Sequence, residues 1–419
     1  MFDKVKDMAA DATLTTGTAA DLGYGYWLIA ETTIGTLEDG SAGVATRILL
    51  DTAGTEDLTI TAKESYPTPE KKITAVTNGA VKDDDSATAQ VGDLVTFEIS
   101  ANLPNNVEIY KDAIGTQGYK FKFSDTLSNG LDFVAISSVT IDNKTADSTK
   151  YTATTAAHSL EIDWANILAD TNAANGVVVK VTYTARVNAS AQTGIAGNPN
   201  TFKITYSNNP NSDGTGESVP VEVKVYTFKL DIVKTKAENE FLAGAGFVLK
   251  NAEGKYYKFD AAVAAVEDDP ETTDVDESVA AQAAAVSWVT DIKEATEYTS
   301  NATDGKLDGD FVGLPEGTYT IVEKTVPTGY NKANDISFTV SAAAVATDDT
   351  ITVTMTPTPE GAVTADANYD FHSTILNQTG TELPSTGGIG TTIFYVVGSI
   401  LVVAAGVLLI TKKRMSREG

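Results

Sequence analysis

The sequence predicts an all-β protein, in which tandem Ig-like β-sandwich domains are followed by one C-terminal transmembrane helix. The composition is rich in Thr, Val and Ala and is punctuated by Gly and Asn, which favours many short strands. Apolar and polar residues alternate with a period of two in several segments, as expected of strands with one buried face. An apolar run over residues 391–410 predicts the helix.

The bulk numbers limit the partners and cofactors. A chain of 419 residues is long enough for two to four domains with real cores. Its formal net charge of -27 repels nucleic acid phosphates and anionic lipid head groups, so we expect neither as a partner. Because the chain has no cysteine, disulfides, thiolate zinc sites and cysteine thioesters are excluded. We expect no metal and no cofactor.

The C-terminal segment has the pattern of a membrane span. It reads TTIFYVVGSILVVAAGVLLI over residues 391–410, with no charge in it. Lys412, Lys413, Arg414 and Arg417 follow, which places the C-terminus in the cytoplasm and everything upstream outside. The alternative, a buried core helix, fits the unbroken apolar run and the basic stop less well. The membrane contact of this chain is therefore expected through this helix alone.

A pentapeptide motif precedes the apolar run. The order of pentapeptide, apolar helix and basic tail resembles the sorting signal of sortase substrates of Gram-positive bacteria. In that family the enzyme's thiolate attacks the threonine carbonyl and releases the segment that begins with the glycine. It then passes the acyl group to an amine, so the helix is a temporary anchor. The resemblance implies sortase and peptidoglycan as partners and a place at the cell wall. The pentapeptide consists of Leu383, Pro384, Ser385, Thr386 and Gly387.

Turn-rich breaks divide the chain near residues 66–69, 208–216 and 378–384. The first twenty residues lack the apolar region of a signal peptide, which export would require, so either the start is misplaced or the chain is a fragment. We favour truncation, because GYWLIAET at 25–32 followed by LTITAK at 58–63 resembles the closing half of a pilin N-terminal domain. An acidic segment over 267–277 is interpreted as a solvated loop, with calcium binding as the alternative. The expected pieces are an N-terminal domain over 1–64, a middle domain over 65–224, a third domain over 225–380 and the sorting signal over 381–419.

The third domain resembles the Cna protein B-type domains of Gram-positive pilins. The resemblance lies in KLDIVKT at 229–235, GLPEGTYTIVEKTVPTGYN and ILNQTGTELPSTGG, and covers about residues 226–378. In that family a lysine on the first strand condenses with an asparagine on the last strand, assisted by a glutamate. Carried over to this chain, the resemblance implies an isopeptide bond from Lys234 to Asn377, with Glu323 as its catalyst.

The alternation of the strands supports these roles. Lys234 is in phase with Leu230 and Ile232, and Glu323 is in phase with Ile321, so both side chains should point into the core. Burial of an unpaired charge is costly and favours a neutral amine, which is a nucleophile, and a neutral acid, which can polarise an amide and shuttle protons. The alternative is a buried Lys–Glu ion pair beside a hydrogen-bonded asparagine.

The middle domain offers a second trio. PTPEKKI contains Lys71, DTLSNGLDF contains Asp125, and Asn200 is in phase with Phe202 and the apolar positions after it. The segment from about residue 66 to 223 resembles the Cna protein A-like middle domain of backbone pilins, in which an aspartate is the acid. This implies a bond from Lys71 to Asn200. One alternative is a register shifted by one residue, in which the neighbouring Lys72 faces inward. The other is that Lys71 is an ordinary surface lysine.

Such bonds would join the first and last strands of each sandwich, so that tension loads a covalent link. Each closes more than 100 residues into a loop, worth about 4 to 5 kcal/mol if the loop entropy behaves as it does for a disulfide.

Backbone pilins also present an acceptor lysine at the end of the N-terminal domain, typically in a Val-Tyr-Pro-Lys stretch. Here Ile60-Thr61-Ala62-Lys63 occupies that place, keeping the lysine but not Tyr and Pro. Lys63 is the predicted acceptor, and an ordinary exposed lysine is the alternative.

The resemblance implies an LPXTG-anchored major pilin, polymerised through Lys63 and Thr386 with neighbouring subunits and contributing to adhesion. The second hypothesis is a wall-anchored adhesin or minor pilin that binds a host or surface ligand and is not polymerised. An enzyme acting on an external substrate has little support, because the chain has two histidines, His158 and His372, and no phosphate-binding glycine loop. We therefore expect no enzyme.

Overall fold

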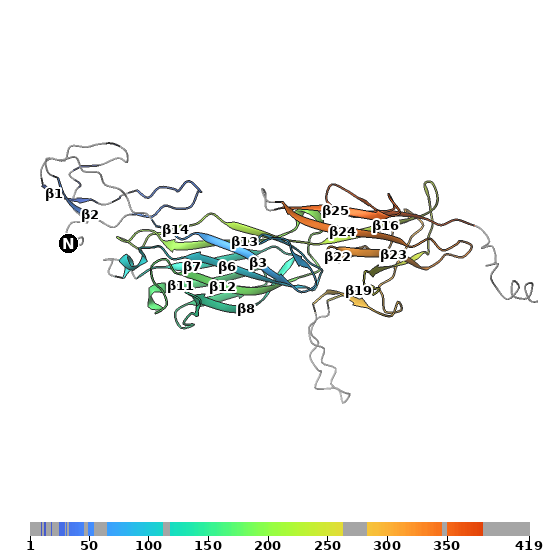
Figure 1. The fold of residues 1–419 in the computed structure, drawn as a ribbon, viewed down its shortest axis with the longest axis horizontal. Helices are drawn as coiled ribbons and strands as arrows, with labels where there is room; N and C mark the ends of the chain where they lie inside the picture. The colour runs from blue at the N-terminus through green and yellow to red at the C-terminus, as the bar shows by residue number, and fades with distance from the viewer. Residues whose placement is uncertain are drawn as a thin grey trace, which may run out of the picture.

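The computed structural model describes residues 65–111, 118–262, 283–345 and 350–379, and shorter stretches between residues 10 and 53. In this part of the chain the regular elements are β-strands and short 3-10 helices, which confirms the all-β prediction. No helix among the described residues is long and apolar enough to cross a membrane. The predicted span at 391–410 lies outside them. Figure 1 shows the N-terminal strands and two sandwiches following one another along the longest axis.

The first described strands form a hairpin. Strand β1 (Gly25–Ile29) pairs antiparallel with β2 (Leu49–Ala53). The segment between them touches the middle sandwich: the main-chain nitrogen of Ala42 donates to Glu217 O at 2.9 Å and that of Ala45 donates to Asn208 O at 2.7 Å. These bonds attach the N-terminal segment to one end of the next unit.

The middle unit is a sandwich of two sheets. One sheet has five strands in the order β3-β6-β12-β8-β9, and the other has eight, in the order β10-β11-β7-β13-β15-β5-β4 with β14 on β13. The strands are β3 (Pro69–Val76), β4 (Ala80–Val81), β5 (Ser86–Thr88), β6 (Leu94–Asn102), β7 (Phe121–Leu127), β8 (Leu131–Ile141), β9 (Lys144–Thr145), β10 (Thr152–Ala156), β11 (Ser159–Trp164), β12 (Val178–Val187), β13 (Asn198–Ser207), β14 (Thr215–Glu217) and β15 (Val221–Tyr226). The 3-10 helices η1 (Val107–Tyr110), η2 (Ile167–Ala169) and η3 (Gly194–Ala196) lie in the connections.

The third unit is also a two-sheet sandwich. Strands β17-β16-β27-β26, with β22 on β16, form a five-stranded sheet, and β20-β19-β18-β23-β24-β25, with β21 on β18, form a seven-stranded one. The strands are β16 (Phe228–Ala237), β17 (Glu240–Phe241), β18 (Gly246–Asn251), β19 (Tyr256–Asp260), β20 (Ala285–Val289), β21 (Tyr298–Thr299), β22 (Phe311–Leu314), β23 (Gly317–Thr325), β24 (Ile336–Val345), β25 (Thr350–Thr358), β26 (Thr364–Ala365) and β27 (Phe371–Leu376). The first strand, β16, and the last, β27, are parallel neighbours, with Lys234 opposite Ile375.

The two cores arise from the alternation seen in the sequence. Val95, Phe97 and Ile99 on β6 and Val181 and Tyr183 on β12 are fully buried, while the residues between them are partly exposed. The two strands pair with Val181 opposite Ile99 and Tyr183 opposite Phe97, so their apolar side chains form one continuous face. Burial of such a face is the main stabilising contribution of a sandwich.

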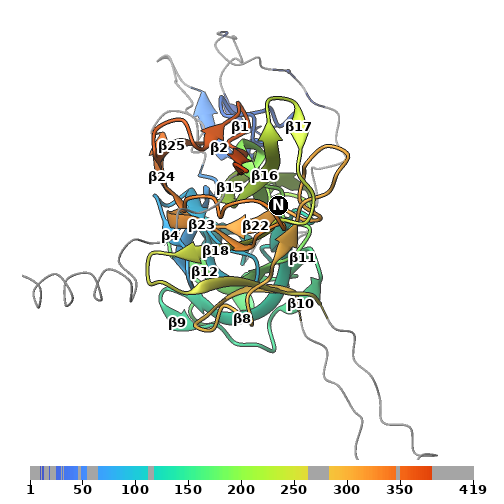
Figure 2. The same ribbon diagram turned by 90° about the vertical axis from the view of Figure 1, so that its right-hand side faces the viewer.

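A hydrogen-bonded joint links the two sandwiches. Only Thr227, which is buried, separates the end of β15 from the start of β16. The Gln90 side chain donates to Val286 O at 3.0 Å and accepts from Trp288 Nε1 at 3.1 Å. At another contact, Ile195 N donates to Asn368 O at 2.8 Å. The end-on view in Figure 2 shows both units around a common axis.

Candidate functional site

Lys234, Glu323 and Asn377 meet inside the third sandwich. Lys234 lies on β16, Glu323 on β23 of the facing sheet, and Asn377 directly after β27. Their exposed fractions are 0%, 2% and 1%. The alternation of β16 and β23 turns the lysine and the glutamate inward, and the parallel pairing of β16 with β27 brings the asparagine beside the lysine.

Hydrogen bonds fix the orientation of all three side chains. Asn377 Nδ2 donates to Glu323 Oε1 at 2.7 Å, and the main-chain nitrogen of Ala333 donates to Glu323 Oε2 at 2.6 Å. Lys234 Nζ donates to the carbonyl oxygens of Ile375 at 2.8 Å and Thr235 at 3.0 Å. The lysine is therefore held by neutral acceptors next to the asparagine.

Burial acts on the amine of Lys234. It lowers the pKa of Lys234 to about 8, although the charge of Glu323 opposes the shift. Near pH 8 about half of these amines are neutral and therefore nucleophilic. Asn377 Oδ1 is buried and has no hydrogen-bond partner among the described residues, so the amide is held through its nitrogen, the atom that a condensation would expel.

Lys71, Asp125 and Asn200 meet inside the middle sandwich. Lys71 lies on β3 of the five-stranded sheet, while Asp125 on β7 and Asn200 on β13 come from the facing sheet. Their exposed fractions are 4%, 1% and 0%. The neighbouring Lys72 points outward and pairs with Asp84 at 2.9 Å. Of the two adjacent lysines, the structure thus places Lys71 in the core.

A tyrosine hydroxyl connects the members of this second cluster. Lys71 Nζ donates to Asp125 Oδ2 and, at 3.0 Å, to Tyr183 Oη. Tyr183 Oη donates to Asp125 Oδ1 at 2.8 Å and accepts from Asn200 Nδ2 at 2.7 Å. As in the third unit, the carbonyl oxygen of the asparagine, Asn200 Oδ1, is buried without a partner in the described part of the chain.

The apolar surroundings favour neutral groups in this cluster. Burial lowers the pKa of Lys71 and raises that of Asp125, and the attraction between the two opposes both shifts. The pKa of Tyr183 is raised well above its ordinary value, chiefly by burial. Lys71 Nζ also lies 5.3 Å from the ring centre of Phe97 and 5.5 Å from that of Tyr183. The three side chains are enclosed in the core, which suits reactions between a neutral amine and a neutral acid.

Sequence reasoning missed Tyr183 as a member of the site. The alternation of apolar and polar residues over 177–187 predicts only that this side chain faces inward. The available signal was a hydroxyl at an inward-facing position, since a buried tyrosine usually needs a hydrogen-bond partner. Which partner it finds depends on the packing of the two sheets and cannot be read from one strand.

The placement of Asn200 requires one correction. The expectation that each bond would join the first and last strands holds for the positions of Lys234 and Asn377, at β16 and the end of β27. It is wrong for the middle unit, because Asn200 lies on β13, and β14 and β15 follow before the unit ends. Strand β15 pairs antiparallel with β13, with Val223 opposite Asn200. A bond from Lys71 to Asn200 would therefore leave residues 201–226 outside the closed loop.

Several predicted residues lie outside the described part of the chain. They are the acceptor Lys63, the pentapeptide at 383–387, the basic tail and the acidic loop at 267–277. Of the two histidines, His158 Nδ1 lies 2.9 Å from Leu131 O, and His372 Nδ1 lies 2.7 Å from Asp231 Oδ2. Among the described residues no group of His, Asp and Glu side chains could hold a metal ion.

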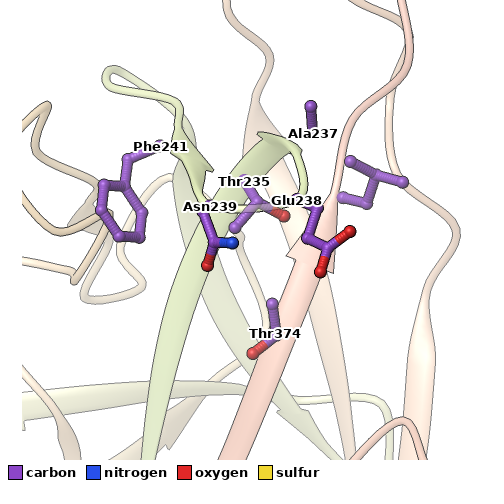
Figure 3. A pocket seen from close by; sticks show the side chains of 7 residues that line it. Thr235, Ala237, Glu238, Asn239, Phe241 and Thr374 are labelled. Atoms are coloured by element: carbon purple, nitrogen blue, oxygen red, sulfur yellow. The ribbon is translucent and has the colours of Figure 1, made fainter.

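An open pocket lies at the end of the third unit (Figure 3). Thr235 and Phe241 from the β16–β17 hairpin line one side, and Thr374 and Leu376 from β27 line the other. Glu238 is the carboxylate among the lining residues. The pocket lies over the ends of β16 and β27, beside the positions of Lys234 and Asn377 in the chain.

Comparisons with known proteins agree with this architecture. The family model of the SpaA prealbumin-like fold domain matches residues 228–359, and that of the LPXTG cell wall anchor motif matches residues 376–416. The trypsin-resistant surface T6 protein of Streptococcus pyogenes serotype M6 is 25% identical over 399 residues, covering 85% of this chain and 70% of that protein.

Solved structures share the fold. The T6 backbone pilin of serotype M6 Streptococcus pyogenes superposes with a TM-score of 0.51 at 18% identity, covering 81% of each chain. The full-length major pilin RrgB of Streptococcus pneumoniae gives a TM-score of 0.50 at 17% identity, covering 86% of this chain and 84% of that one. The fold and the anchor define a cell-wall-anchored surface protein of Gram-positive bacteria. Within that class the chain shares its fold with backbone pilins.

Proposed function

We propose that this protein is a pilin, the structural backbone subunit of a sortase-assembled pilus, and that it is stabilised by two intramolecular isopeptide bonds, Lys71 to Asn200 and Lys234 to Asn377. The observation that carries the proposal is that each buried lysine shares a closed cluster with a carboxyl group and an asparagine amide. Buried lysines otherwise cost much free energy, so two such clusters in one chain favour a reaction that consumes the amine.

In the third unit the reaction would proceed through Glu323. The neutral Lys234 Nζ attacks Cγ of Asn377, the new N–C bond forms, and the C–Nδ2 bond breaks. Glu323, whose Oε1 lies 2.7 Å from Nδ2, takes a proton from Nζ and passes it to that nitrogen, which leaves as ammonia. The cluster holds the reactants together, so proximity supplies a large part of the rate.

The bonds would stiffen the subunit against tension. In the third unit a bond from the first strand to the end of the last encloses residues 235–376, so that pulling on the ends bypasses the hydrogen-bonded ladders. In the middle unit the enclosed part is 72–199. No reductant reverses an amide, which suits a chain without cysteine on an exposed cell surface.

Assembly would use the two ends of the chain. Sortase would cleave after Thr386 and join its carbonyl to Lys63 of the neighbouring subunit or, at the base of the pilus, to peptidoglycan. Adhesion to host or other surfaces would be a property of the assembled fibre. If Lys63 is not an acceptor, the same anchor would hold a wall-attached adhesin or minor pilin. Incubation of the chain with a pilin-polymerising sortase, comparing Lys63→Ala with the parent, separates these two roles.

The two bonds are tested by intact mass and peptide mapping of residues 1–380. The expected result is a mass lower by two ammonia molecules, with linked peptides containing Lys71 with Asn200 and Lys234 with Asn377. An undiminished mass in folded protein would refute both bonds and leave a wall-anchored sandwich protein without internal crosslinks.

A further inference from the structure

The Tyr183 hydroxyl lies at the centre of the middle cluster. It is within 3.0 Å of Lys71 Nζ, 2.8 Å of Asp125 Oδ1 and 2.7 Å of Asn200 Nδ2. The ring is fully buried and is stacked against Phe97, with ring centres 5.4 Å apart. A side chain held in this way has one position available for its hydroxyl, between the acid and the amide nitrogen.

The two clusters differ in how the acid reaches the amide. In the third unit Glu323 accepts directly from Asn377 Nδ2. In the middle unit Asn200 Nδ2 donates to Tyr183 Oη, and Tyr183 Oη in turn donates to Asp125 Oδ1. Aspartate is one methylene shorter than glutamate, and the tyrosine hydroxyl contacts both the acid and the amide.

We propose that Tyr183 is a catalytic residue of the middle unit, which passes a proton from the Asp125 carboxyl to the departing nitrogen of Asn200. The inference rests on the proposed bond from Lys71 to Asn200 and assigns the step that allows ammonia to leave. Tyrosine is able to do this because a hydroxyl both donates and accepts a hydrogen bond.

The step balances as follows. Lys71 Nζ attacks Cγ of Asn200, and Nδ2 of the resulting adduct becomes an amine with a free lone pair. Tyr183 gives its hydroxyl proton to Nδ2 and takes one from Asp125 through Oδ1, while Nζ gives a proton to Asp125 Oδ2. The Cγ–Nδ2 bond breaks, ammonia leaves, and Asp125 and Tyr183 return to their starting protonation. One proton has moved from Nζ to Nδ2, and no co-reactant is needed.

The test follows bond formation during synthesis of the full chain. Parent, Tyr183→Phe and Tyr119→Phe chains are made by cell-free translation, stopped in acid at intervals, and mapped by mass spectrometry. Tyr119 is the matched control, because it is fully buried in the same unit and its hydroxyl has no hydrogen-bond partner in the described structure. We expect Tyr183→Phe to slow the Lys71–Asn200 bond by about 100-fold or more, and Tyr119→Phe to leave its rate within a few-fold of the parent.

Internal controls separate the outcomes. The Lys234–Asn377 bond in the same molecules should form at the parental rate, and the emission of the buried Trp164 reports folding of the middle unit. Should Tyr183→Phe fail to fold, 3,5-difluorotyrosine at position 183 keeps the ring and makes the hydroxyl more acidic, and we expect it to change the rate several-fold. An unchanged rate in the folded variant, or with difluorotyrosine, overturns the role of Tyr183. Absence of the bond from the parent chain instead overturns the proposed crosslink itself.

Discussion

Asn377 Nδ2 donates a 2.7 Å hydrogen bond to Glu323 Oε1 and thereby connects the end of the last strand to the facing sheet of the third sandwich. The bond holds the amide by its nitrogen, next to a lysine whose amine is fully buried. The same relation between an amide nitrogen and an acid, lengthened by a tyrosine hydroxyl, occurs in the middle sandwich. One chemical arrangement is thus built twice from different strands.

Replacement of Glu323 by glutamine should block the bond in the third unit alone. Glutamine keeps the shape but cannot exchange a proton with the leaving nitrogen, so the mass should rise by one ammonia, and the Lys234 peptide should be found unlinked. The free energy of unfolding of that unit should fall by about 4 to 5 kcal/mol, the estimate for a loop of this length. Glu297→Gln, which removes a surface partner of Lys324, is the control and should leave the bond intact. A linked Lys234 peptide in Glu323→Gln would contradict the role of the glutamate.

The adjacent lysines of β3 should behave differently. Lys71→Met should lose the middle bond and raise the mass by one ammonia, because Lys71 is the buried member of the pair. Lys72→Met should lose only a half-exposed ion pair with Asp84, worth less than about 1 kcal/mol. Mass spectrometry of the two variants distinguishes them directly. If Lys72→Met were the variant that lost the bond, the register of β3 would be wrong by one residue.

An unlinked Lys234 should make stability depend on pH. In Asn377→Ala the amine stays free, with a folded-state pKa of about 8 against an ordinary value of 10.5. Between these values the unfolded chain binds more protons than the folded one, so the free energy of unfolding should rise with pH from about 8 to 10.5 and level off above. Denaturant unfolding across this range measures the slope.

The control for this titration is the double variant Asn377→Ala/Lys234→Met. It retains every other group that titrates in the range, and its slope should be smaller than that of Asn377→Ala. Equal slopes would show that Lys234 is not responsible for the pH dependence.

Tension should extend the middle unit by a short, defined length. A link from Lys71 to Asn200 shields residues 72–199, but residues 201–226 remain in series with the load through the β13–β15 ladder. Single-molecule stretching should therefore show a step of at most about 90 Å from the middle unit, and no comparable step from the third unit. In Asn200→Ala the whole middle unit should unravel over about 500 Å. A middle unit that never extends in the parent chain would contradict this load path.

The sequence by itself determined the all-β class, the anchor and the inward phase of Lys234 and Glu323. These features depend on local patterns. A period of two in the sequence decides on which face of a strand a side chain lies. An apolar run followed by basic residues can be identified as a membrane span without knowledge of its contacts. It is for this reason that Lys234 and Glu323 could be expected in one core from the residues around them.

Only the tertiary structure decided which strands face each other. It placed Asn200 on β13, with β14 and β15 still to follow, and it placed the Tyr183 hydroxyl between Asp125 and Asn200. It also chose Lys71 over Lys72, because the pairing of β3 with β6 sets the register. The physical reason is that strand order and sheet packing are made by contacts between residues far apart in the chain, and a one-residue shift in pairing reverses every side chain.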